Sequence, residues 1–254
     1  MRGAHDATST GTDWLVPQWR APARVRAFVT TRNGGVSRGA YASLNLGYAG
    51  DDRAAVDQNR HRVQQHLPAA ATWLRQVHGA NVVEVGAPNA STPTADAAVT
   101  RAPRVPLVVM IADCLPVFLA ARSQDVVGVA HAGWRGVAAG VLENTVAAMG
   151  CPPHDIVAWI GPGIGPQAFE VGRDVYDAFV QHDAGTANAF APLREGKWLA
   201  DLPRLARQRL ARAGVHDVEG GTWCTLHDPA RFFSYRRDGA SGQTNREGGV
   251  WRAS

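Results

Sequence analysis

The chain is poor in cysteine, and what it lacks narrows the protein classes to consider. Its 254 residues include three cysteines, Cys114, Cys151 and Cys224, an odd number at wide spacings. This pattern does not indicate a disulfide framework, and it favours a reducing compartment. Residues 1–14 carry no apolar segment typical of a signal peptide, and no run of about 18 apolar residues is present. We therefore expect a cytoplasmic protein without a membrane partner.

Charged residues are also scarce, at 19% of the chain, and the net charge is only +4. A hydrophobic content of 45% suits a sizeable core and argues against disorder. Arginine is spread along the chain without a long basic run, so small anionic substrates fit at least as well as nucleic acid, which we do not expect as a partner. Repeats and low-complexity tracts are missing too. We interpret residues 1–12 as a flexible N-terminal segment and 13–254 as a single catalytic domain.

Apolar runs and helical periodicities alternate along the chain and predict a mixed α/β fold. Strands are expected at 25–31, 73–77, 81–85, 106–112, 117–120, 126–130, 156–160 and 232–235, and around Cys224. Helices are expected at 53–67, 136–149, 173–182 and 201–213. The run PLVVMIA at 106–112 is continuous and apolar, as in strands buried on both faces.

A cysteine and two histidines stand where apolar runs give way to loops. Cys114 lies in ADCLP, His131 in HAGWRG and His78 in QVHG. Thiolate and neutral imidazole are zinc ligands, and three protein ligands leave a fourth position for water, as in catalytic sites. Two alternatives stay open on spacing alone: Cys114 is a nucleophile activated by a histidine, or it is a small buried hydrophobe beside hydrogen-bonded histidines.

Motifs spread over residues 28–239 resemble those of the YfiH/DUF152 family, also called polyphenol oxidase or laccase-domain proteins. The matching segments include TTRNGGVS at 30–37, SLNLG at 43–47, QVHG at 76–79, ADCLPVFL at 112–119, HAGWRG at 131–136, IGPGIGPQAFEVG at 160–172 and FFSYRRDG at 232–239. The resemblance implies a single-domain layered α/β/β/α sandwich with mixed sheets. It also implies that His78, Cys114 and His131 are the metal ligands and the catalytic residues.

The resemblance further implies a function. Family members are described as purine nucleoside phosphorylases acting on adenosine, inosine, guanosine and methylthioadenosine, and as adenosine deaminases. We therefore expect zinc as cofactor, nucleoside and phosphate as small-molecule partners, and a monomer or weak homodimer. An alternative is a hydrolase that edits UDP-muramyl-amino acid precursors of peptidoglycan. In a third reading the metal is structural, with Cys224 as a fourth ligand that closes the site.

Several polar residues in these motifs are candidates for binding substrate. We predict that Asn45, Gln76 and Arg135 contact it, because Arg135 follows His131 closely and Gln76 shares a face with His78 in an extended segment. Arg32 belongs to the same N-terminal motifs as Asn45.

Asp113 and Glu170 have two interpretations each. Asp113 serves either as an acid/base or ligand-orienting group or as a turn cap, and Glu170 either binds ribose or forms a salt bridge.

Two further observations limit the resemblance. A multicopper oxidase needs a cluster held by many histidines, usually in His-x-His pairs, whereas this chain has nine histidines and no such pair. We therefore reject a laccase mechanism within one chain. The sequence also departs from the family pattern after Gly239, where Gln243 stands and an arginine is usual. The role of that arginine is in doubt unless Arg246 replaces it.

Overall fold

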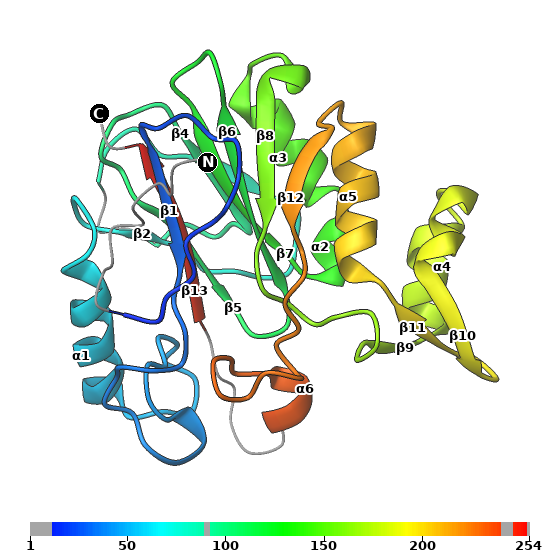
Figure 1. Ribbon diagram of the computed structural model, residues 1–254, viewed down its shortest axis with the longest axis horizontal. Coiled ribbons are helices and arrows are strands. Elements are labelled where there is room, and N and C mark those ends of the chain that lie inside the picture. The colour runs from blue at the N-terminus through cyan, green and yellow to red at the C-terminus, as the bar shows by residue number, and fades with distance from the viewer. Residues whose placement is uncertain (1–11, 89–91, 240–245, 253–254) are drawn as a thin grey trace, which may run out of the picture.

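The computed structural model describes residues 12–88, 92–239 and 246–252. Two sheets form its centre (Figure 1). The first has four strands in the order β1 (Val25–Val29), β13 (Arg246–Arg252), β5 (Leu107–Ile111) and β2 (Thr72–Trp73). The second has six, in the order β12 (Asp217–Gly220), β8 (Ile156–Ile160), β6 (Leu115–Ala121), β7 (Val127–Ala132), β4 (Ala97–Thr100) and β3 (Val82–Glu84). Both sheets are mixed, since each contains parallel and antiparallel pairs.

Helices cover the outer faces of the two sheets. Helix α1 (Arg53–Gln64) lies on the side of the four-stranded sheet, and α2 (Trp134–Ala138), α3 (Val141–Met149) and α5 (Leu202–Arg212) lie on the side of the six-stranded sheet (Figure 1). A small third sheet, β10 (Phe190–Arg194), β11 (Lys197–Ala200) and β9 (Glu170–Gly172), projects at one end with α4 (Arg173–Val180). Short helical turns occupy Gly39–Tyr41, Pro153–Asp155, Ala184–Ala189 and, as α6, Tyr235–Asp238.

The central strand β6 shows why the layers form. All seven of its residues are buried, and successive side chains point to opposite faces. Val117 and Leu119 join the apolar cluster under the helices, whereas Phe118 faces the other sheet and stacks on Trp159 with ring centroids 5.5 Å apart. A third cluster joins α1 to the four-stranded sheet through Val63 and Phe28. The expected single-domain α/β fold with an α/β/β/α layering is confirmed.

The structure corrects four of the expected elements. The helix expected at 136–149 is two helices, because Gly140 takes a left-handed φ of 92° between them. The strand expected at 73–77 is reduced to Thr72–Trp73. The segment 232–235 is not a strand, since α6 begins at Tyr235, and Cys224 makes only an isolated bridge with Gly163.

The remaining expectations about chain ends lie largely beyond the described residues. Residues 1–11 of the predicted flexible segment, and Gln243 in the departure from the family pattern, fall outside them. Within the described part of the chain, no helix is long and apolar enough to cross a membrane.

Candidate metal and substrate site

The pairing of β6 with β7 brings Cys114 and His131 together. The two strands are antiparallel, and Pro116 pairs with His131. Cys114 directly precedes β6 and His131 lies near the end of β7, so the start of one strand meets the end of the other. Gly133 follows closely, and a Cβ there would lie 2.7 Å from Cys114 Sγ and 3.3 Å from His78 Cδ2. The sequence therefore uses glycine where the backbone passes against two of the candidate ligands.

His78 reaches the same place on the loop between β2 and β3. The loop is held by one carboxylate, because the backbone N–H groups of Val77, His78 and Gly79 all donate to Asp96, at 3.1, 2.9 and 2.7 Å. His78 itself has a φ of 59°, a left-handed conformation that L-residues adopt only where the surroundings enforce it. Asp96 directly precedes β4, so the rigid sheet sets the position of the loop.

Asp96 also fixes the orientation of His131. Its Oδ1 lies 2.9 Å from Nδ1 of His131, and both side chains are buried. An ionised carboxylate only accepts hydrogen bonds, so Nδ1 carries a proton. In the neutral form of the ring, which metal binding requires, Nε2 is then left with a lone pair. Burial opposes the ionisation of Asp96, but the hydrogen bonds from His131 and from the backbone of Gly79 and Val77 hold its pKa below the ordinary value.

The resulting cluster has the dimensions of a metal site. One ligand atom each from His78, Cys114 and His131 lie within 4.8 Å of one another. Burial would raise the pKa of the Cys114 thiol, but the charge of His131 and hydrogen bonds from both histidines lower it to about 6. In turn, burial would lower the pKa of His131, and the Cys114 thiolate and Asp96 raise it to about 9. A thiolate facing two imidazoles is a donor set that suits zinc.

A pocket of about 630 Å³ opens over this cluster. It is lined by Leu74, Arg75, Gln76, His78, Met110, Ala112, Asp113, Cys114, His131, Trp134, Arg135, Ile164, Phe169, Leu202, Tyr235 and Arg236. A cavity of this size with apolar walls and a few converging polar groups is typical of small-molecule sites.

The structure places two of the three predicted substrate-binding residues at this pocket and one elsewhere. Arg135 is exposed, with its guanidinium 4.5 Å from the ring centroid of Trp134. Gln76 lines the pocket, but its amide is engaged with the backbone of Met110, donating to its carbonyl and accepting from its N–H at 2.7 Å each. Asn45 is fully buried away from the pocket lining and holds the backbone of Gly47.

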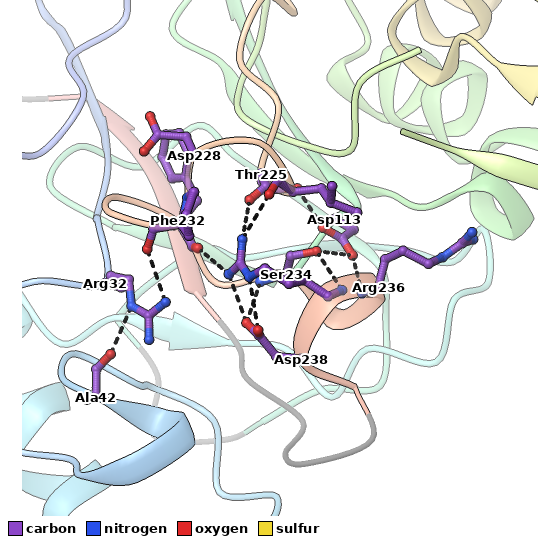
Figure 2. Close-up of polar contacts among 12 residues, drawn as sticks. Arg32, Ala42, Asp113, Thr225, Asp228, Phe232, Ser234, Arg236 and Asp238 are labelled. Atoms are coloured by element: carbon purple, nitrogen blue, oxygen red, sulfur yellow. Dashed lines mark hydrogen bonds and ion pairs between the residues drawn. The ribbon is translucent and has the colours of Figure 1, made fainter. Parts of the chain in front are cut away.

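Arg32 and Glu170 also lie outside the pocket lining. The guanidinium of Arg32 donates to the carbonyls of Ala42 and Pro229 (Figure 2). Of the two interpretations of Glu170, the structure has the salt bridge, in which Arg194 donates to both carboxylate oxygens at 3.0 and 2.6 Å. Neither side chain is therefore positioned to bind a substrate over the cluster.

Asp113 has a structural partner set of its own. Its carboxylate accepts hydrogen bonds from the hydroxyls of Thr225 and Ser234 and from the backbone N–H of Arg236 (Figure 2). It therefore ties a segment more than 100 residues further along the chain to the residue next to Cys114. Asp113 takes a φ of 82°, which this network enforces.

Two residues at the site differ from the sequence-based account. Asp96 was missed, although an acidic residue in the apolar stretch TADAAVT was a usable signal. Cys224 is absent from the cluster of described ligand atoms, and its Sγ accepts a hydrogen bond from the N–H of Gly165. Among the described residues, therefore, no second cysteine completes the site as a fourth ligand.

Comparisons with known proteins assign the chain to a family. A family model described as multi-copper polyphenol oxidoreductase laccase matches residues 26–250. A protein of Pseudomonas aeruginosa named purine nucleoside phosphorylase PA4543 is 51% identical over 232 residues, covering 91% of this chain and 95% of that protein. Purine nucleoside phosphorylase YfiH of Escherichia coli K12 is 48% identical over 234 residues, covering 90% and 95%. The chain belongs to the YfiH/DUF152 family.

Solved structures of the YfiH/DUF152 family have the same fold. The crystal structure of Neisseria meningitidis protein NMB0706 matches with a TM-score of 0.90 and 48% identity, covering 96% of this chain and all of that one. YlmD of Geobacillus stearothermophilus matches with a TM-score of 0.83 and 32% identity, covering 91% and 93%. The sequence does not fit the multicopper cluster that the family description names, because its nine histidines include no His-x-His pair.

Proposed function

We propose that this protein is a zinc-dependent purine nucleoside phosphorylase that also deaminates adenosine. The observation that carries the proposal is the candidate metal-ligand cluster of His78, Cys114 and His131, which lines a pocket that arginine side chains also line. The relatives named purine nucleoside phosphorylase, about half identical over nine-tenths of the chain, support the reaction class. Adenosine, inosine, guanosine and methylthioadenosine are the proposed substrates.

The donor set fits zinc, with His78, Cys114 and His131 as its ligands. When bound, zinc supplies a Lewis acid that polarises substrate and water at the open coordination position. The protein's own contribution is orientation. Asp96 fixes the ring of His131 and the loop of His78, so the ligand atoms are already grouped before a metal arrives.

The pocket walls supply the contacts that phosphorolysis requires. Trp134, Phe169 and Tyr235 offer aromatic surface on which a purine can stack. Arg135 and Arg236 offer donors to phosphate. A phosphate oxygen bonds to C1′ of the ribose while the bond from C1′ to the purine nitrogen breaks. The electron pair stays on the base, which takes up a proton.

Deamination would use the same pocket with water in place of phosphate. Water adds at C6 of adenine and ammonia leaves, giving inosine. The alternative peptidoglycan-editing hydrolase would also need activated water at this metal, so the assay has to compare substrate classes directly.

The test is to incubate zinc-loaded protein with adenosine, with and without phosphate, and to follow adenine, ribose 1-phosphate and inosine. We expect adenine and ribose 1-phosphate in equal amounts only with phosphate, and a slower release of inosine without it. Cys114→Ala and His131→Ala should lose both phosphorolysis and deamination, whereas the exposed His182→Ala should match the parent. No turnover of any purine nucleoside, alongside hydrolysis of a UDP-muramyl-amino acid, would assign the alternative.

A further inference from the structure

Many arginines of this protein pair with a carboxylate, but within the described part of the chain the arginines that line the pocket do not. Away from the pocket, Arg194 pairs with Glu170, for example, at 2.6 Å. Arg75, Arg135 and Arg236 line the pocket, and none of them forms an ion pair within the described part of the chain. An unneutralised group of guanidiniums beside a cavity favours an anionic ligand.

Arg236 is held both at its backbone and at its guanidinium. Its backbone N–H donates to Asp113 at 2.7 Å, and its Nη1 donates to the backbone carbonyl of Glu170 at 2.9 Å. Its guanidinium carbon lies 5.5 Å from the ring centroid of Phe169. The other guanidinium N–H groups have no partner among the residues that the structure describes. The side chain is thus fixed at both ends with donors left over, which lowers the entropy lost when it binds a ligand.

The carboxylate that lines the pocket does not neutralise the Arg236 guanidinium. Among the lining residues, Asp113 carries the only carboxylate, and it accepts three hydrogen bonds from Thr225, Ser234 and the backbone of Arg236. All three donors belong to residues 225–236, and the guanidinium of Arg236 is not among them. Figure 2 shows the guanidinium of Arg236 extending away from Asp113. The positive charge is therefore left for a ligand.

We propose that Arg236, with Arg135, binds the phosphate co-substrate, and that Asp113 is the positioning residue that holds Arg236 in place. The proposal rests on the phosphorylase function for the identity of the anion. Arginine donates two parallel hydrogen bonds to a tetrahedral oxyanion, which a single ammonium group does not. Asp113 is adjacent to Cys114 in the chain, so the same turn sets both the metal ligand and the arginine that faces the anion.

The first test measures binding and needs no turnover. Inorganic phosphate is titrated into the zinc-loaded protein and followed by the line width of its ³¹P resonance. Arg236→Gln should weaken phosphate binding about 10- to 100-fold, the effect of losing a charge-assisted hydrogen bond. Arg204→Gln is the matched control, because Arg204 is exposed and has no ion pair within the described chain, and it should bind as the parent does. Equal binding by Arg236→Gln and the parent would overturn the proposal.

A parallel titration with adenosine 5′-monophosphate distinguishes the two sources of a phosphate group. Binding of inorganic phosphate should depend on Arg236 more strongly than binding of the nucleotide does. The reverse order would assign Arg236 to a phosphate carried by the substrate and would overturn its assignment to the co-substrate.

The second test uses steady-state kinetics. In Arg236→Gln the KM for phosphate should rise about 10- to 100-fold, the factor expected for phosphate binding. The KM for adenosine should change less than about 3-fold, and the amount of bound zinc should be unchanged. If the protein is a phosphorylase and Arg236→Gln leaves the KM for phosphate unchanged, the anion site is refuted and the proposed function stands. Phosphate binding through Arg236 in a protein that cleaves no nucleoside would refute the function and leave the site intact.

The role of Asp113 is tested with two substitutions that both tolerate its left-handed φ of 82°. Asp113→Gly deletes the carboxylate and should raise the phosphate KM as Arg236→Gln does. Asp113→Asn retains an acceptor oxygen for the Arg236 N–H and should restore most of the parent value. An unchanged phosphate KM in Asp113→Gly, with normal thermal stability, would refute the positioning role.

Discussion

Asp96 and Asp113 are both buried carboxylates beside the same pocket, and they hold different parts of it. Asp96 is fully buried, and its partners are three backbone N–H groups of the His78 loop and the ring of His131. Asp113 is 9% exposed, and its partners all belong to residues 225–236. Cys114 lies between these two systems. The comparison teaches that the residues a carboxylate binds, rather than its burial, decide its contribution.

The largest effect is expected from removing Cys114, the candidate ligand that lies between the contacts of Asp96 and those of Asp113. Cys114→Ala should abolish zinc binding and lower phosphorolysis on the order of 1,000-fold or more, because the metal supplies several kcal/mol of transition-state stabilisation. Metal analysis and initial rates check this. Cys224→Ala is the matched cysteine control and should keep its zinc. Loss of zinc in Cys224→Ala would mean that a fourth ligand closes the site.

The next change separates Asp96 from Asp113. In Asp96→Asn the amide oxygen takes the place of Oδ2 and accepts from Val77 and Gly79. The NH₂ takes the place of Oδ1, so the N–H of His78 loses its acceptor and Nδ1 of His131 has to accept. The ring proton moves to Nε2, where the metal binds, so zinc affinity should fall about 10- to 100-fold. Long-range ¹H–¹⁵N NMR reads the tautomer, and a competition titration reads the affinity.

Asp113→Asn is the matched control for this change, since it makes the same substitution in the other system. It should leave both the tautomer of His131 and the zinc affinity as in the parent. Equal losses of zinc affinity in the two variants would show that the two carboxylates do not divide their roles as the contacts indicate.

A smaller effect is expected from crowding the backbone at the cluster. In Gly133→Ala the new methyl would lie 2.7 Å from Cys114 Sγ, a contact that the backbone has to relieve by moving. Zinc affinity should fall about 10-fold with little change in melting temperature. Gly86→Ala, where an added Cβ meets nothing within 4 Å, is the control and should be silent. An unaffected zinc site in Gly133→Ala would mean that the cluster is looser than its geometry indicates.

The smallest effect concerns the stability of the segment that Asp113 holds. Burial would raise the pKa of Asp238, but hydrogen bonds from Arg237 and Ser234 and the charge of Arg237 lower it below the ordinary 3.8. A lowered pKa stabilises the fold above pH 3.8, and that contribution is lost as the pH falls through the lowered value.

Asp238→Asn should therefore lower the free energy of unfolding by about 1 kcal/mol at pH 7, and by less near pH 3. Urea unfolding of both proteins across this range measures the difference. A constant difference between the variants at all pH values would contradict an ionic origin. Zinc affinity should not change, because Asp238 belongs to the Asp113 side of the comparison.

The sequence predicted the strands of the interior better than the outer segments. All residues of β6 and β8 are buried on both faces, so their apolar runs are continuous and easily recognised. The segment 232–235 was misread as a strand because Phe232 and Phe233 are apolar, although they are buried as parts of a loop. Apolar character marks burial, and burial does not require a strand.

The candidate site was predicted unevenly for a related reason. His78, Cys114 and His131 stand in recognisable motifs, and the structure groups them. Asn45 stands in a motif as well, yet it holds the turn at Gly47, because its short amide bonds to nearby backbone. Arg236 lies in the motif FFSYRRDG, but the motif alone predicts no role for it. Nothing in the local sequence shows that the backbone N–H of Arg236 bonds to Asp113, which lies 123 residues earlier.

By itself, the sequence predicted the α/β class, the family and the three candidate metal ligands, because these depend on apolar patterns and on residues within recognisable motifs. Only the tertiary structure decided that Asp96 orients His131 and that Asp113 holds Arg236 at the pocket. The physical reason is that a hydrogen bond needs two groups within about 3 Å. The partners here lie 35 and 123 residues apart in the chain, so only the packed sheets and loops bring them to that distance.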